Sequence, residues 1–425
     1  MITILGAGLA GLSAAYHLVD GYRILEREAE PGGLCRSVIK GGYVFDIAPH
    51  ILFTRDEYAR GLFAKLLEGN LLTHDRQAYI YMMGTYVKYP FEANLHPLPR
   101  EVREECIQGV VDRPTLKPRN FMEWIRSSFG EGIARHYMVP YNEKTWKYPL
   151  DRMNTEWLGG RVPSPSVEDM RRGAEGEQKV DYGPNAQFWY PESGGIGALP
   201  RALAEGLDVS YGSNAVEVKP TKKGVKVTYQ RNGFTKYVES EYALSSLPLP
   251  EIVRIMSDVP EDVVRAADRL VYNSIICVNV GVKRPRITDK HWLYFPEPEL
   301  VFNRISFPMN FSPGTTPPGR SSVLVEVTYR GRQPDLDEIK GRVLHDLVET
   351  ELLKEGDEVE VCEASSHRYA YVIYDLDHRR NVEAVHRYLR ESKVIPMGRF
   401  GEWEYHNMDK AILSGKRAAE SLPVD

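Results

Sequence analysis

The chain begins Met1-Ile-Thr-Ile-Leu-Gly-Ala-Gly-Leu-Ala-Gly-Leu-Ser-Ala-Ala15 and soon reaches Tyr22-Arg-Ile-Leu-Glu26. This order of apolar and small residues predicts a strand, a glycine turn, a helix and a second strand. Gly6 lets the chain turn sharply, Gly8 lets backbone N–H groups approach a pyrophosphate, and Gly11 lets the helix pack close to the sheet. Glu26 places a carboxylate where ribose hydroxyls are bound. The stretch therefore predicts a dinucleotide-binding unit in a Rossmann-like α/β fold.

The next segment, Glu30-Pro-Gly-Gly-Leu-Cys-Arg-Ser37, narrows the choice of cofactor. A second glycine pair and an arginine directly after the second strand resemble the FAD-binding fold of the glutathione reductase type, and NAD enzymes rarely need them. Two other readings stay open. Residues 1–18 could be a signal peptide, although no basic region precedes the apolar run, and Gly32-Gly33 could be an ordinary turn. We expect non-covalent FAD, since no Cys or His stands in a recognisable flavin-attachment motif.

Composition argues against several classes of protein. At 425 residues the chain exceeds what one hydrophobic core usually serves, so two or three domains are expected. Its 54 basic and 59 acidic residues give a net charge of −5 without a dense basic cluster, which argues against nucleic acid as a partner. No apolar stretch reaches the length of a membrane span, and the 4 scattered cysteines lack a CxxC pair, which argues against a metal site. We expect a cytoplasmic protein.

The pattern along the chain predicts three structural units. We expect the FAD-binding unit to combine residues 1–75, 188–250 and 386–425. An inserted helical domain covers 96–187, and a substrate domain with a mixed β-sheet covers 251–385, joined by a hairpin at 76–95. Residues 163–187 contain prolines, glycines and charges with little apolar periodicity, so we expect a mobile surface stretch there.

The order of the motifs resembles the UDP-galactopyranose mutase family, within the larger amine-oxidase and protoporphyrinogen-oxidase-like group of FAD flavoproteins. The glycine motifs and the terminal Gly398-Arg-Phe-Gly401 belong to the larger group. The specific segments are Ala48-Pro-His-Ile-Leu-Phe-Thr54, Tyr89-Pro-Phe-Glu-Ala-Asn94, Pro140-Tyr-Asn-Glu-Lys-Thr-Trp146, Trp157-Leu-Gly-Gly-Arg161 and Trp292-Leu-Tyr-Phe-Pro-Glu297. The resemblance extends over almost the whole chain.

The resemblance implies a particular reaction. In that family, N5 of the reduced flavin attacks the anomeric carbon of a nucleotide-sugar and expels the diphosphate, after which the sugar ring opens and recloses. We therefore expect a mutase acting on UDP-galactopyranose or a related nucleotide-sugar, with NAD(P)H or another reductant for activation. The competing interpretation is an FAD-dependent oxidoreductase of the amine-oxidase group. Arginines that face the flavin favour the mutase, whereas an apolar pocket favours the oxidase; the oligomeric state stays open.

The resemblance also assigns roles to single residues. At the flavin and the reacting sugar it places His50, Arg304, Arg161, Tyr294, Tyr374 and Tyr405, with both arginines on the diphosphate. At the nucleotide it places Arg76, Tyr89, Trp124, Asn142 and Trp146. Against FAD the glycine motifs and the resemblance place Gly6, Gly8, Ala10, Gly11, Glu26, Arg27, Gly33, Leu34, Cys35, Val216, Gly398, Arg399, Asn407 and Met408.

Simpler roles compete with these assignments. Arg161 could form a surface ion pair, Trp124 could pack in a core, and so could any one of the 25 tyrosines. Two positions depart from the fungal branch of the family, which has an arginine at the place of Val139 and a glutamine at the place of Glu92. A carboxylate near phosphates is unfavourable unless it is paired. Because Arg304 is expected at the substrate and not in the core, we expect its replacement to leave folding intact.

Overall fold

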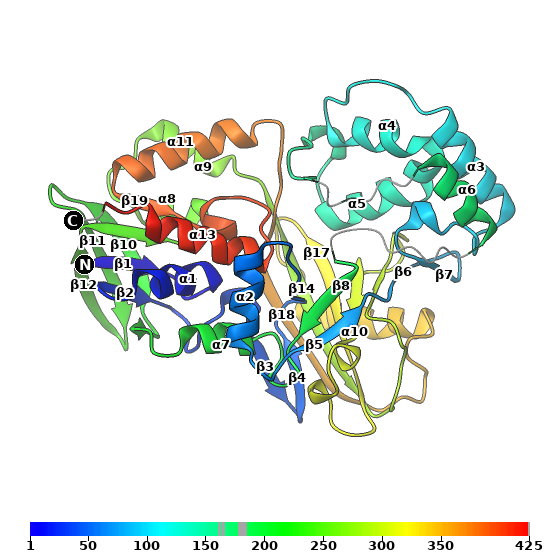
Figure 1. Ribbon diagram of the computed structural model, residues 1–425, viewed down its shortest axis with the longest axis horizontal. Coiled ribbons are helices and arrows are strands. Elements are labelled where there is room, and N and C mark those ends of the chain that lie inside the picture. The colour runs from blue at the N-terminus through cyan, green and yellow to red at the C-terminus, as the bar shows by residue number, and fades with distance from the viewer. Residues whose placement is uncertain (160–161, 163–165, 177–184, 424–425) are drawn as a thin grey trace.

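The computed structural model describes residues 1–159, 162, 166–176 and 185–423. The molecule is elongated, with both chain ends at one side and a group of helices at the other (Figure 1). Its described strands form sheets of five, three and seven strands and two smaller two-stranded sheets.

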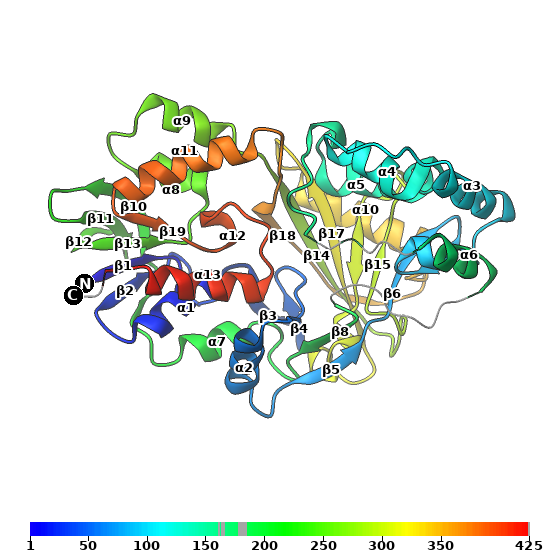
Figure 2. The same ribbon diagram turned by 45° about the horizontal axis from the view of Figure 1, so that its top comes forward.

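The five-stranded sheet has the order β19-β13-β1-β2-β9, and all its pairings are parallel. Its strands are β1 (Ile2–Leu5), β2 (Tyr22–Leu25), β9 (Val209–Ser210), β13 (Tyr242–Ser245) and β19 (Val394–Pro396). Helices α1 (Leu9–Leu18) and α13 (Met408–Glu420) lie side by side against it (Figure 2). Three separate stretches of the chain thus build one sheet, and the predicted Rossmann-like α/β fold is confirmed.

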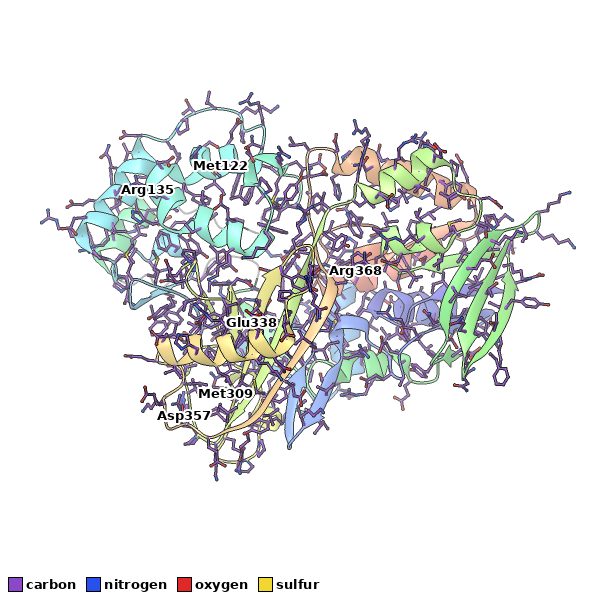
Figure 3. The ribbon with its side chains drawn as sticks, turned by 180° about the vertical axis from the view of Figure 1, so that it is seen from behind. Met122, Arg135, Met309, Glu338, Asp357 and Arg368 are labelled. Atoms are coloured by element: carbon purple, nitrogen blue, oxygen red, sulfur yellow. The ribbon has the colours of Figure 1, made fainter. Side chains whose placement is uncertain are left out.

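The seven-stranded sheet has the order β18-β14-β17-β16-β15-β6-β7. Its strands are β6 (Ala78–Met82), β7 (Thr85–Lys88), β14 (Tyr272–Val282), β15 (Trp292–Tyr294), β16 (Arg304–Ser306), β17 (Ser321–Tyr329) and β18 (Val359–Val372). It is mixed, because β15 pairs with β6 in parallel and the other pairings are antiparallel. Helix α10 (Leu336–Glu349), which carries Glu338, covers its back face through Ile339, Val343 and Leu347 (Figure 3).

The opposite face of this sheet carries polar side chains in register. Cys277 pairs with Glu326, Glu326 pairs with Arg304, and Arg304 pairs with Tyr294. Residues paired across neighbouring strands point to the same side. An arginine, a glutamate and a tyrosine from three strands therefore lie on the face away from α10.

The helical part contains α3 (Arg100–Val111), α4 (Phe121–Ile133), a π-helical turn (Ala134–Met138), α5 (Val139–Trp146) and α6 (Val167–Glu175). Residues 163–165 and 177–184 of the stretch expected to be a mobile surface segment lie outside the described residues, and Val167–Glu175 form α6. Its first turn is fixed by a capping box between Ser166 and Asp169. A Cβ on Gly173 would lie 2.0 Å from the Ala93 carbonyl oxygen, so the helix packs through small residues, which an apolar periodicity does not reveal.

The remaining elements connect these parts. They are α2 (Glu57–Leu66), α7 (Ala198–Ala204), α8 (Leu249–Ile255), α9 (Glu261–Asp268), α11 (His378–Glu391), α12 (Gly398–Gly401), the strands β3 (Ser37–Lys40), β4 (Tyr43–Asp46), β5 (Leu72–Asp75) and β8 (Gln187–Tyr190), and the antiparallel sheet of β10 (Asn214–Pro220), β11 (Val225–Arg231) and β12 (Phe234–Ser240). Within the described ranges, no helix is both long and apolar enough to cross a membrane. The same residues contain no group of His, Cys, Asp or Glu side chains that could hold a metal ion.

Candidate active site

The glycine turn after β1 has the conformation that the motif predicts. Gly6 has φ +95°, and a Cβ on Gly11 would lie 1.9 Å from the Gly6 carbonyl oxygen. Only glycine fits either position. Gly8, the N-cap of α1, gives that helix no side-chain hydrogen bond, so the first N–H groups of α1 remain available to a ligand.

A second helix begins at the same edge of the sheet. Asn407, the N-cap of α13, also makes no side-chain cap, and Met408 behind it is buried. Gly398 has φ +74°, and a Cβ there would lie 2.7 Å from the Ala10 side chain, so the segment passes close to α1. Two helix N-termini that follow parallel strands without side-chain caps form a favourable site for the pyrophosphate of a dinucleotide.

The adenosine end of that site is formed around β2. The buried Glu26 carboxylate accepts from the Ala7 N–H at 2.6 Å and from the Glu28 N–H at 2.9 Å, and its further lone pairs can accept from ribose hydroxyls. Val216 stands at a β-bulge between Ala215 and Glu217, where its backbone leaves the ladder. Arg27 instead extends into solvent and pairs with Glu28.

The second glycine segment forms a 3-10 turn over Gly33–Cys35, which includes Leu34. Gly8 and Gly32 form a β-bridge, so this turn lies directly on the first one. Burial raises the pKa of the Cys35 thiol to about 12, which keeps it neutral. The Arg36 side chain donates to the Gly33 carbonyl and to Glu28, and it thereby braces the turn.

Arg399 provides the test of whether FAD fits here. Its Nε and Nη2 atoms are buried without a hydrogen-bond partner among the described residues. Its guanidinium carbon lies 5.1 Å from the Tyr371 ring and 4.9 Å from the Tyr405 ring, beside the start of α13. Buried donors of this kind require an acceptor. Oxygen atoms of a bound flavin dinucleotide would supply one, so the residues present fit FAD.

His50 lies on the loop after β4, within electrostatic reach of both Arg399 and Arg304. Burial, together with these two arginines, lowers the pKa of His50 to about 4, so the imidazole is neutral at neutral pH. Its Nδ1 lies 2.9 Å from the Ala48 carbonyl oxygen and therefore carries the proton. The Nε2 atom is left as an acceptor, which suits control of a proton at the cofactor.

Arg304 and Glu326 form a bidentate ion pair across β16 and β17. Arg304 Nε donates to one carboxylate oxygen, and Nη2 donates to the other at 2.8 Å. Glu326 is only 1% exposed, and burial raises the pKa of its carboxyl while the Arg304 charge acts against that rise. The structure contradicts the reason for expecting that Arg304 can be replaced without affecting folding, because removal of Arg304 leaves a buried carboxylate uncompensated.

Several tyrosines lie within electrostatic reach of Arg304, among them Tyr141 and Tyr294. The Tyr294 ring lies 5.4 Å from Tyr141 and 5.6 Å from Tyr89, and the Trp292 indole donates to the Tyr294 hydroxyl at 2.9 Å. The Arg76 guanidinium lies 4.8 Å above the Tyr89 ring. These contacts bring the predicted Tyr294, Tyr89 and Arg76 together in one row.

A second aromatic group contains Tyr371, which is within electrostatic reach of both Arg304 and Arg399. It consists of Trp146, Trp157, Tyr371 and Tyr405, with ring centroids 4.9 to 6.3 Å apart. Asn142 is in hydrogen-bond contact with Trp146, since its Oδ1 accepts from the indole N–H at 3.0 Å. The predicted nucleotide residues Asn142 and Trp146 thus belong to this group, where Asn142 orients the ring of Trp146.

Other predicted residues lie elsewhere. The Trp124 ring packs on Phe121 at 5.8 Å and Phe129 at 5.5 Å and lies partly buried against the core of the helical part. The Tyr374 hydroxyl donates to Glu404 and accepts from the Tyr405 N–H at 2.8 Å, which places Tyr374 behind Tyr405. Arg161 lies outside the described residues.

Glu92 stands beside the row of Tyr294, Tyr89 and Arg76, within electrostatic reach of Tyr89. It is 2% exposed, and burial raises the pKa of its carboxyl to about 7. Its charge would also act on Tyr89 and Tyr137, whose pKa values it helps to raise. With a pKa of about 7, the Glu92 carboxyl is about half protonated near pH 7, and its protonated form can donate as well as accept a hydrogen bond, as a glutamine amide can.

Sequence reasoning missed Glu326 and Tyr371. Glu326 had a detectable signal, because a single carboxylate within the apolar strand Ser321–Tyr329 must be paired if that strand is buried. Tyr371 had none, since its strand β18 alternates too many polar and aromatic residues for one to stand out.

Comparison with known proteins agrees with this geometry. A model of the flavin-containing amine oxidoreductase family matches residues 9–422. The chain belongs to this family. The FAD cofactor expected from the glycine motifs is thereby confirmed, because members of the family are FAD flavoproteins.

Similarity to particular proteins is uneven within the family. The structure is similar to that of reduced UDP-galactopyranose mutase, with a TM-score of 0.92, 28% identity and coverage of 99% of this chain and 93% of the other. This bears out the resemblance read from the motifs. Putrescine oxidase with bound putrescine shares the fold at a TM-score of 0.66 and 18% identity, with coverage of 99% and 98%. In sequence, L-amino acid oxidase Cdc18 of Crotalus durissus cumanensis is 26% identical over 255 residues, 54% of this chain and 48% of that protein. The chain thus matches about half the length of this relative.

Proposed function

We propose that the protein is a flavin-dependent nucleotide-sugar mutase that interconverts pyranose and furanose forms, with UDP-galactopyranose as the first substrate to test. The observation that carries the proposal is the ion pair of the partly exposed Arg304 with the buried Glu326, on the sheet face that carries Tyr294. A fixed cation beside the flavin suits a leaving diphosphate. The similarity to UDP-galactopyranose mutase over nearly both chains supports it.

Arg304 is the group that binds the diphosphate. Of the five N–H groups of a guanidinium, two are held by Glu326, and the others can reach a second acceptor. The ion pair also fixes the plane of the guanidinium before substrate arrives, so little reorganisation is needed as negative charge develops on the leaving group. The pair therefore stabilises the transition state more than the bound substrate.

Tyrosines complete the site without adding charge. Trp292 occupies one lone pair of the Tyr294 hydroxyl, which leaves the phenol proton for a phosphate oxygen. Tyr405 is held through its backbone by Tyr374, which fixes the position of its ring next to Arg399. The rings around both arginines exclude water and strengthen these interactions.

FAD, when bound and reduced, supplies the nucleophile for the anomeric carbon. The chain contributes the neutral His50, whose Nε2 can accept a hydrogen bond from an N–H or O–H group beside the cofactor. Reduction by NAD(P)H or another reductant is needed once, because the isomerisation itself transfers no net electrons.

The test is an anaerobic incubation of the dithionite-reduced, FAD-loaded protein with UDP-galactopyranose, followed by chromatography of the nucleotide-sugars. We expect a second peak with the retention of UDP-galactofuranose, and no such peak with oxidised protein. Equal conversion by the oxidised protein, or none by the reduced protein, would contradict the proposal.

The second candidate is an FAD-dependent oxidase, which the partial sequence match to L-amino acid oxidases favours. An arginine can bind the carboxylate of an amino acid as well as a phosphate. Hydrogen peroxide formation in air with a panel of L-amino acids and diamines would support this candidate, and its absence together with sugar conversion would exclude it.

A further inference from the structure

Strand β18 is the edge strand of the seven-stranded sheet, and it lies toward the FAD-binding part of the molecule (Figure 1). His367 pairs with Ile275 and Ser365 pairs with Cys277, whose other partner is Glu326. His367 and Ser365 therefore point to the same face of the sheet as Glu326 and Arg304. Figure 3 labels the next residue, Arg368, where β18 passes between the two parts.

The His367 imidazole contacts the loop at residues 47–50, which carries His50 at its end. The loop packs on this face of the sheet, because Ala48 forms a buried cluster with Ile275, the register partner of His367. The Ile47 backbone acts on the His367 imidazole and counters the lowering of its pKa by burial, as a carbonyl that faces the ring does. One residue further along the loop, the Ala48 carbonyl accepts from His50. Two imidazoles thus face neighbouring backbone groups of a single loop.

Ser365 orients the His367 ring. Its hydroxyl lies 3.0 Å from His367 Nε2, on the same strand and the same face. The neighbouring Ser366 points to the other face, where its hydroxyl is 2.8 Å from that of Tyr329. The two serines each make one side-chain hydrogen bond, but only that of Ser365 leads to the 47–50 loop.

We propose that His367, oriented by Ser365, is a positioning residue that holds the 47–50 loop against the sheet and thereby fixes where His50 stands beside the cofactor. The loop begins at the end of β4 and leaves through Thr54, which donates to Asp409 in the first turn of α13 at 2.8 Å. Its far end is thus tied to the FAD-binding part and its near end to the sheet. The assignment of His50 to the reaction rests on the proposed function, whereas the contact of His367 with the loop does not.

The experiment compares four FAD-loaded variants with the wild type: His367→Leu, His367→Asn, Ser365→Ala and the control Ser366→Ala. The visible spectrum and midpoint potential of the bound FAD report on the position of His50, and kcat and KM are measured with UDP-galactopyranose. Asparagine keeps an N–H near the position of the imidazole donor, whereas leucine removes it.

We expect His367→Leu to shift the spectrum and the potential and to lower kcat about tenfold, with KM changed less than about twofold, because ground-state binding at Arg304 is untouched. Ser365→Ala should shift the flavin spectrum and the midpoint potential in the same direction as His367→Leu, but by less. The spectrum and potential of His367→Asn should be close to those of the wild type, and those of Ser366→Ala should be unchanged. A His367→Leu variant with the wild-type spectrum and potential would overturn the proposal, as would an equal shift in Ser366→Ala.

If His367→Leu fails to retain FAD, the spectrum and midpoint potential of Ser365→Ala test the proposal instead, since this variant removes only one hydroxyl. If the wild type does not convert UDP-galactopyranose, the proposed function fails. The spectrum and potential still test the positioning of the loop in that case, so the two failures are distinguishable.

Discussion

The five-stranded sheet and the seven-stranded sheet contribute different kinds of atoms to the site. The first contributes backbone N–H groups at the starts of α1 and α13, with glycines that bring the backbone close. The second contributes side chains, with Arg304, Glu326 and Tyr294 aligned across three strands. Recognition by backbone tolerates few changes of residue, whereas recognition by side chains can be altered one residue at a time. The comparison explains why one fold can keep its cofactor and change its substrate.

Among single substitutions, we expect the largest effect on folding in the glycine turn of the five-stranded sheet. In Gly11→Ala the new Cβ would lie 1.9 Å from the Gly6 carbonyl oxygen, which neither backbone can relieve. We expect loss of folded, FAD-containing protein in size-exclusion chromatography with absorbance detection. The matched control is Gly8→Ala, whose Cβ meets no atom within 4 Å. It should fold but retain FAD less tightly, and a Gly11→Ala protein that retains FAD normally would contradict the steric account.

The protein is expected to lose stability when only one partner of the Arg304–Glu326 ion pair on the seven-stranded sheet is removed. Arg304→Ala leaves Glu326 buried and unpaired, which typically costs about 3–5 kcal/mol of unfolding free energy. The double variant Arg304→Met/Glu326→Leu removes both charges and should recover most of that loss. The free energies of unfolding of the two FAD-loaded variants are compared by urea denaturation. If the double variant were no more stable than Arg304→Ala, the pair would not account for the loss.

These two predictions show why the sequence reveals one half of the site better than the other. Gly6, Gly8 and Gly11 are required by local backbone geometry and are close in sequence, so the motif can be recognised from their spacing. Arg304 and Glu326 meet through strand register, which the sequence does not encode in a short motif. Only the resemblance to a family pointed to Arg304, and nothing in it pointed to Tyr371. The α6 helix was missed for a similar reason, since Gly173 packs by its lack of a side chain.

Glu92 gives a smaller, pH-dependent effect beside Tyr89. Burial raises the pKa of its carboxyl from an ordinary 4.5 to about 7 in the folded protein. Its contribution to stability is therefore fully present below about pH 4.5 and is lost as pH rises to about 7, by on the order of 3 kcal/mol. Glu92→Gln should remove this dependence, so it should be more stable than the wild type at pH 8 and not at pH 4.5. Denaturation midpoints measured at both pH values test this, and parallel pH profiles of the two proteins would contradict it.

The most direct test of the account is the affinity of UDP for the oxidised, FAD-loaded protein, measured by titration calorimetry on the wild type, Arg304→Lys and Arg320→Lys. Lysine keeps a charge opposite Glu326 but loses the two-pronged geometry. Arg320 also pairs with a glutamate, Glu360, outside the proposed site, and so controls for the exchange itself. We predict that Arg304→Lys weakens UDP binding about tenfold or more, which corresponds to about 1.4 kcal/mol, while Arg320→Lys binds as the wild type does. Equal affinity in all three proteins would contradict the claim that the seven-stranded sheet binds the diphosphate through Arg304.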